Sequence, residues 1–118
     1  MVYAKRLSFE PVREAAFGSI TGSYTALGPP LSHNVRLVCI TNTTDVDVYI
    51  SIDAINNHLR IVANSFKLLD VTANMVTQND DAFLIAVGTQ FYVKQTSLGA
   101  PSKGLVFIEV VIAVGGGS

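Results

Sequence analysis

The sequence contains a single cysteine, Cys39, in 118 residues. No internal disulfide can form, so the fold has to be stabilised by packing alone. Cys39 lies between Val38 and Ile40 in an apolar stretch. We therefore expect it to be a small buried core residue rather than a nucleophile.

Charge is also scarce. Charged residues make up 14% of the chain and hydrophobic residues 49%, and the net charge is −1. A surface so short of charge is expected to be covered in part by other subunits. The basic residues are scattered, which predicts no patch for nucleic acid and no binding driven by a strong field. They are Lys5, Arg6, Arg13, Arg36, Arg60, Lys67, Lys94 and Lys103.

Long hydrophobic runs are missing as well. The longest, Leu105–Val114, is interrupted by Glu109 and has about half the length needed to cross a bilayer. The first residues, MVYAKRLSFEP, carry charges where the apolar part of a signal peptide would lie. We therefore expect the chain to fold in the cytoplasm and not to associate with a membrane.

Two adjoining strands between Val35 and Asp53 are the clearest structural signal. Residues 35–41 are apolar at most positions, which is typical of a strand covered on both faces. Residues 42–44, Asn-Thr-Thr, provide a turn. In the second strand, an apolar set predicted to point inward alternates with a set that includes three outward acids. The inward set is Val46, Val48, Ile50 and Ile52, and the acids are Asp45, Asp47 and Asp53.

The rest of the chain reads as further short strands. With the pair above, this makes about eight or nine strands and no convincing helix, which predicts an all-β, single-domain antiparallel β-sandwich or jelly roll; a barrel stays open. Leu105–Val114 is apolar on both faces and is the natural partner of Val35–Thr41. We expect the sandwich to span residues 34–114 and to be followed by a mobile glycine-rich tail, residues 115–118. The other predicted strands are Leu59–Ala63, Phe66–Thr72, Phe83–Val87 and Thr89–Gln95.

Residues 1–33 differ in composition and predict an N-terminal arm. A short strand over Lys5–Phe9 is stopped, or confined to a sheet edge, by Pro11, and Val12–Ala16 can form a turn of helix. Beyond it, large apolar residues are separated by Gly, Ser and Pro. We expect the arm to pack on its own sandwich or on a neighbouring subunit, to serve assembly, and to be dispensable for folding. Its predicted contact residues are Phe9, Phe17, Ile20, Tyr24 and Leu27.

Chemical motifs are hard to find. His33 and His58 lie in predicted loops without a partner at a metal-ligand spacing. Carboxylates could hold calcium, but an acidic outer strand face that prevents mispairing is favoured. These acids are Asp45, Asp47, Asp53, Asp80 and Asp81. No glycine-bearing segment matches a nucleophile elbow or a phosphate-binding loop, so we expect no catalytic residue, no metal and no cofactor.

Two surface features have alternative interpretations. Gln90, Tyr92 and Lys94, together with Tyr49, could form a sugar-binding surface by aromatic stacking, although an ordinary polar strand face is favoured. Asn42-Thr43-Thr44 satisfies the glycosylation sequon, but in a chain without an export signal it is better explained as a turn.

The order of segments resembles small virion structural proteins of tailed bacteriophages. An arm with AFGSITGSYTALGPPL precedes the central strands, and a final strand, GLVFIEVVIAV, ends the domain. The phrases that carry the resemblance are ITNTTDVDVYISID, ANSFKLLDVTAN and GTQFYVKQ. They are packing and turn phrases, and they span nearly the whole chain.

The resemblance implies a non-enzymatic β-sandwich present in many copies on a virion. Its partners would be copies of itself and major capsid, portal or tail proteins. It would decorate or cement the capsid shell, or belong to the head-tail collar or the tail. The alternative is a lectin-like sandwich that recognises carbohydrate on the host surface. No catalytic residue is carried over, because the resembling phrases contain none.

Overall fold

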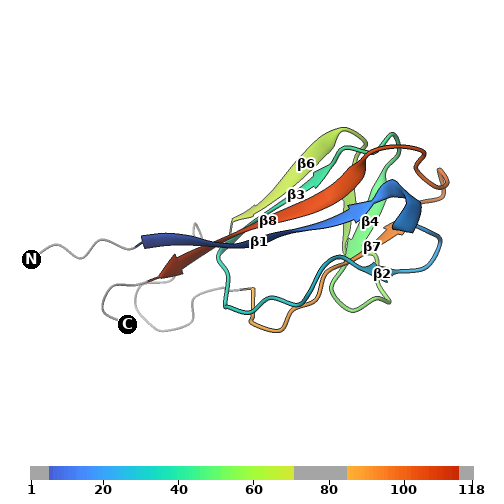
Figure 1. Cartoon of the computed structure of the whole chain (residues 1–118). Coiled ribbons are helices and arrows are strands. Elements are labelled where there is room, and N and C mark those ends of the chain that lie inside the picture. The colour runs from blue at the N-terminus through green and yellow to red at the C-terminus, as the bar shows by residue number, and fades with distance from the viewer. Residues whose placement is uncertain (1–5, 71–84, 115–118) are drawn as a thin grey trace, which may run out of the picture.

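The computed structural model describes residues 6–70 and 85–114. Two four-stranded antiparallel sheets pack against each other (Figure 1). Sheet A has the order β1-β8-β3-β6 and sheet B the order β2-β7-β4-β5. The strands are β1 (Arg6–Ala16), β2 (Thr25–Ala26), β3 (Leu37–Asn42), β4 (Val48–Ser51), β5 (Leu59–Ile61), β6 (Ser65–Asp70), β7 (Tyr92–Gln95) and β8 (Leu105–Val114), with a 3-10 turn η1 (Phe17–Ser19) after β1.

This arrangement confirms the predicted all-β sandwich. Each sheet interleaves strands from both halves of the chain, which is the connectivity of a jelly roll. The described residues contain no α-helix, and none of their helical segments has the length and hydropathy to span a membrane. Jelly rolls serve many functions, so the fold alone does not define one.

The core lies between the sheets and follows the period-two pattern of the strands. In β3, Val38 and Ile40 are fully buried, whereas Leu37 and Cys39 face outward and are half-buried. The predicted pairing of this strand with the last one is confirmed, because β3 and β8 are antiparallel neighbours in the middle of sheet A. The apolar core comprises Ala15, Ile20, Leu27, Leu31, Val35, Val38, Ile40, Val48, Ile50, Ile61, Phe91, Val93, Val106, Ile108, Val110 and Ile112.

The second central strand is shorter than predicted. Val48 and Ile50 are fully buried, as expected, and Val46 is half-buried. Ile52 was predicted to point inward, and this is wrong, because β4 ends at Ser51 and the chain turns away. Ile52 is consequently 53% exposed.

The turn between β3 and β4 is held by a buried side chain. The Asn42 Nδ2 group donates hydrogen bonds to the carbonyls of Val46 (2.9 Å) and Ile61 (3.0 Å), and its Oδ1 accepts one from the Thr44 amide. The predicted Asn-Thr-Thr turn is therefore present. Because the amide that a glycan would modify is buried and occupied, this sequon is a structural turn.

The predicted arm needs a larger correction. β1 runs along β8 from Arg6 to Ala16, with a bulge between Glu10 and Arg13, so the helical turn predicted over Val12–Ala16 is wrong. Pro11 lies at this bulge on the edge of sheet A, where a missing amide donor is tolerated. In Figure 1 the two long strands lie side by side over most of their length. Residues 6–27 are thus part of the sandwich.

Candidate assembly surface

The outer face of sheet A is largely apolar. The strand register aligns Phe66, Thr41 and Phe107 in one row across β6, β3 and β8, and Leu68, Cys39 and Glu109 in the next. Side chains in register on neighbouring strands point to the same side of a sheet. This face comprises Phe9, Glu14, Leu37, Cys39, Thr41, Phe66, Leu68, Asp70, Phe107, Glu109 and Val111.

Several large side chains of this face are exposed to solvent. Phe9 is 68%, Phe66 64% and Leu68 49% exposed. The sequence of β3 and β8 predicted strands covered on both sides, but within the described residues only their inner side is covered. Cys39, predicted to be in the core, is half-buried on this outer face. Sheet A therefore has the composition of a sheet that lacks its second covering layer.

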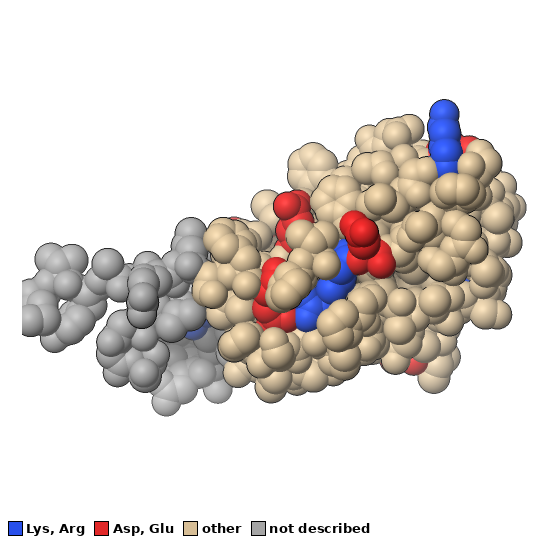
Figure 2. All heavy atoms as spheres, in the orientation of Figure 1, with Lys and Arg blue, Asp and Glu red and all other residues tan. Residues whose placement is uncertain are grey.

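The charges on this face are all acidic. Glu14 lies beside Phe107 at one end, and Glu109 lies in the middle, between the apolar rows. In the part of the chain that the structure describes, neither carboxylate forms an ion pair. Figure 2 shows that most of the visible surface is uncharged, with a group of mixed charges near its middle and a few further charged side chains toward its edges.

The outer face of sheet B is different, because aromatic and basic side chains alternate across it. Lys94 pairs with Tyr49, and Tyr49 pairs with Arg60 on the next strand. The Lys94 Nζ lies 4.7 Å from the ring centroid of Tyr24 and 5.9 Å from that of Tyr49. Arg60 forms a 2.8 Å ion pair with Asp47. Tyr24, Lys94, Tyr49 and Arg60 thus form one row, with cations over the rings.

This row includes most of the residues proposed for sugar binding. Tyr49 and Lys94 lie side by side, and Tyr92 follows the same outward alternation in β7. Gln90 precedes β7, and its Nε2 donates to the Gly28 carbonyl at 2.7 Å. The Lys94 ammonium lies over the Tyr24 and Tyr49 rings, so it competes with a sugar for stacking on the ring faces that it covers.

The five predicted arm residues are not brought together. Ile20 and Leu27 are buried in the core, and Tyr24 belongs to the row on sheet B. Phe17 is 41% exposed in the η1 turn, and Phe9 lies on the outer face of sheet A. Only Phe9 is on the apolar face. The members of that face on β3 and β8 belong to strands predicted to be covered on both sides, so a strand apolar on both sides was the signal that could have revealed its centre. The members on β6 were predicted to share one strand face, but nothing in the sequence placed that face beside β3.

A buried ion pair fixes β1 to the loop that follows β2. At the β1 bulge, Arg13 donates to the Glu10 carboxylate at 2.5 Å and to the carbonyls of Pro29 (2.8 Å) and Pro30 (3.0 Å). Glu10 also accepts hydrogen bonds from the Ser32 amide (3.1 Å) and lies 3.0 Å from His33 Nδ1. His33, predicted to be an ordinary loop residue, thus belongs to this cluster.

This cluster makes the stability of the fold pH-dependent. Burial by itself raises the pKa of Glu10, but hydrogen bonds from His33, Arg13 and Ser32 outweigh it and lower the pKa from 4.5 to about 2. A carboxyl whose pKa is lower in the folded state stabilises the fold above its unfolded pKa and loses this effect as the pH falls toward the folded value. We expect the free energy of unfolding to drop by about 3 kcal/mol between pH 5 and pH 2 from this group.

Denaturant unfolding of wild type and Glu10→Gln across that pH range measures the effect. The variant is expected to be less stable at pH 6 and to depend less on pH. Glu14→Gln, on the same strand but exposed, is the control and should retain the wild-type slope. Equal slopes for wild type and Glu10→Gln would contradict the assignment.

Ser51, Asp53 and His58 are the residue types of a catalytic triad and lie close together. Their hydrogen bonds, however, stabilise the loop that follows β4. The buried Ser51 Oγ donates to Asp53 at 2.8 Å and accepts from the Ala54 amide. His58 Nδ1 accepts from the Ile52 amide at 3.2 Å. Backbone amides of Asn56 and Ile55 hold the pKa of Asp53 well below its usual range. No accessible nucleophile results.

The proposed calcium ligands are dispersed. Asp45 accepts hydrogen bonds from the Ser102 amide and hydroxyl, while Asp47 pairs with Arg60. Asp80 and Asp81 lie outside the described residues. Within residues 6–70 and 85–114, no group of three or more His, Cys, Asp or Glu side chains could hold a metal ion.

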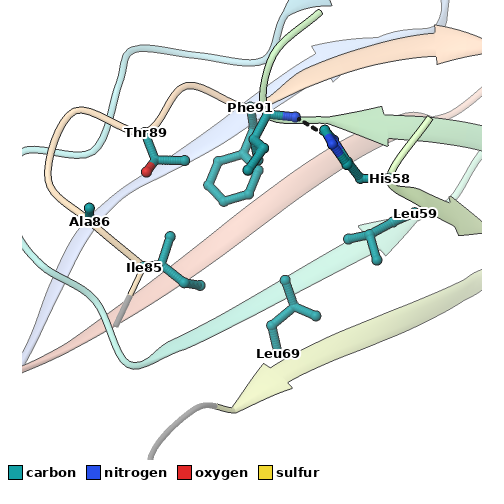
Figure 3. A pocket seen from close by; sticks show the side chains of 8 residues that line it. His58, Leu59, Leu69, Ile85, Ala86, Thr89 and Phe91 are labelled. Atoms are coloured by element: carbon teal, nitrogen blue, oxygen red, sulfur yellow. Dashed lines mark hydrogen bonds between the residues drawn. The ribbon is translucent and has the colours of Figure 1, made fainter. Parts of the chain in front are cut away.

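A pocket of about 370 Å³ lies at one end of the sandwich (Figure 3). The described residues of its lining are almost entirely apolar, and His58 is the one titratable side chain among them. No sequence pattern indicated it, because its walls come from separate segments. It is lined by Ile52, His58, Leu59, Leu69, Ile85, Ala86, Thr89 and Phe91.

No protein-family model and no curated protein matches the chain. Among solved structures, the chain is similar to the Dit protein (gp 19.1) of SPP1, described as a paradigm of the hub adsorption apparatus in phages that infect Gram-positive bacteria. The identity is 14% and the TM-score 0.38, over 88% of this chain and 47% of that protein. The chain thus spans about half the length of that protein.

Proposed function

We propose that the chain is a non-enzymatic structural subunit of a bacteriophage particle and that it assembles through the outer face of sheet A. The observation that carries the assembly role is the apolar outer face of sheet A. Exposed Phe9, Phe66 and Leu68 on the edge strands β1 and β6 flank half-buried apolar side chains of β3 and β8, whose sequences are apolar on both sides. The virion setting is drawn from the resemblance of the sequence to small phage virion proteins. Its place would be on the capsid shell, at the head-tail collar or in the tail.

The size of the exposed side chains makes such an interface energetically useful. Phe9, Phe66 and Leu68 are each about half to two-thirds exposed. Complete burial of a large apolar side chain contributes about 1.5–3 kcal/mol, so covering these three contributes several kcal/mol. A partner that also covers Phe107 and Val111 would complete the second layer of sheet A.

Sedimentation velocity over a range of protein concentrations tests the assembly role. We expect wild type to form oligomers and Phe66→Ser/Leu68→Ser to sediment as a monomer. At a protein concentration low enough that wild type is also monomeric, the two should have the same melting temperature, because both side chains point to solvent and association no longer stabilises wild type. Leu98→Ser is the matched control: Leu98 is 60% exposed but lies in the β7–β8 loop, away from this face. Unchanged association of the Phe66/Leu68 variant would overturn the proposal.

A lectin-like role is the second candidate, and the structure supports it less well. Among the described surfaces, only the aromatic row on sheet B suits sugar stacking. There the Lys94 ammonium lies over the Tyr24 and Tyr49 rings. A glycan-binding screen in which wild type binds and Tyr49→Ala does not would favour carbohydrate recognition.

A further inference from the structure

We propose that the outer face of sheet A of one copy packs against the outer face of sheet B of a second copy. This inference rests on the proposed function, because it names the partner of the same apolar face. The partner that covers the outer face of sheet A is thus another copy of this chain, and it contacts that face with a different surface, the outer face of its sheet B. Charge complementarity and the composition of the two faces support it.

The charges of the two faces are opposite. Within the described residues, sheet A presents Glu14 and Glu109 without ion pairs, and its outer face contains no Lys or Arg. On sheet B, Asp47 already pairs with Arg60. Lys94 forms no ion pair in the same part of the chain and lies in the centre of its row. Glu109, in the middle of the outer face of sheet A, can therefore pair with Lys94, in the middle of the outer face of sheet B.

A contact between two copies of sheet A is disfavoured by the same charges. It would cover Glu109 with a surface that offers only carboxylates, and an acid buried without a counter-charge is costly. Packing against sheet B instead supplies the Lys94 ammonium. Opposite charges on the two surfaces also select the correct partner face and orient it.

The side chains of sheet B suit an interface with an apolar partner. Tyr24, Tyr49 and Tyr92 combine a large apolar ring with a polar group, and tyrosine is enriched in the central parts of protein interfaces. On the opposite side, Phe66, Leu68 and Phe107 provide the apolar surface. Two sheets can stack with their side chains interdigitated at about 10 Å, as in the sandwich itself.

The two faces lie on opposite sides of the sandwich, which determines the type of assembly (Figure 1). Each copy that uses sheet A in one contact still has sheet B free for the next. Such head-to-tail contacts close into a ring when the rotation allows it and otherwise continue as a filament. The assembly should therefore contain more than two copies.

Charge reversal tests the contact. Glu109→Lys and Lys94→Glu should each raise the dissociation constant of self-association about tenfold or more, because each places like charges opposite each other. An equimolar mixture of the two variants should regain assembly. In the mixture, the new lysine of the first variant meets the new glutamate of the second, while the other contact keeps the native Glu109 and Lys94. Sedimentation velocity measures all three samples, and thermal melts verify that each variant is folded.

The outcomes separate this inference from the proposed function. If Phe66→Ser/Leu68→Ser abolishes assembly while Lys94→Glu leaves it unchanged, the apolar face acts in assembly but sheet B is not its partner. If, in addition, Glu109→Lys associates more tightly with wild type than wild type does with itself, two copies of sheet A face each other. If the Phe66/Leu68 variant assembles normally, the proposed function itself fails.

Discussion

A chain that begins at Ser32 should not fold cooperatively. It lacks β1, β2 and the segments next to them, and so loses the buried side chains of Ala15, Ile20 and Leu27. Burial of an Ile or Leu side chain contributes about 1.5–3 kcal/mol, and the lost pairing with β8 adds to this, so the deletion removes a large part of the roughly 5–15 kcal/mol typical of a domain. Circular dichroism during heating should show no cooperative transition.

Phe9→Ser in the full chain is the control for this deletion. Phe9 lies on β1 but is 68% exposed, so its loss should leave the melting temperature within a few degrees of wild type. A cooperative melt of residues 32–118 near the wild-type temperature would show that the N-terminal segment is a separable arm, as its composition predicts.

Gly104→Ala should be among the most destabilising single substitutions in the described chain, with a loss of about 4 kcal/mol or more. Gly104 has a φ of +88°, in the region that glycine tolerates and other residues rarely adopt. A Cβ atom there would lie 2.3 Å from the Thr43 carbonyl oxygen and 2.9 Å from the Thr44 Cα. Both are backbone atoms of the turn between β3 and β4, so they cannot move aside as a flexible side chain would.

Two further glycines separate the causes of this effect. Gly99 has a φ of +101° but nothing within 4 Å of a Cβ, so Gly99→Ala should cost only about 1–2 kcal/mol of backbone strain. Gly18 has neither constraint, and Gly18→Ala should change stability by less than about 0.5 kcal/mol. Urea unfolding ranks the three variants. A loss for Gly104→Ala no larger than that for Gly99→Ala would show that the β3–β4 turn relaxes around the added methyl group.

Local pattern was sufficient for the fold class and for the strands in the middle of the sheets. Alternation of apolar and polar residues identified β4, because a strand with one buried face carries a period of two in its own sequence, and near-continuous apolar runs identified β3 and β8. These runs also predicted that β3 and β8 are apolar on both sides, which was part of the signal for the proposed assembly surface.

The tertiary structure decided what depends on contacts between distant segments. Only the pairing of β1 with β8 showed that the N-terminal segment belongs to the sandwich and that Glu10 and Arg13 are buried together. Likewise, only the stacking of the sheets showed which side of β3 and β8 is left uncovered. The periodicity of a strand's sequence shows that one of its faces is apolar. Whether that face is covered by the same chain or by a partner depends on which strands lie across from it.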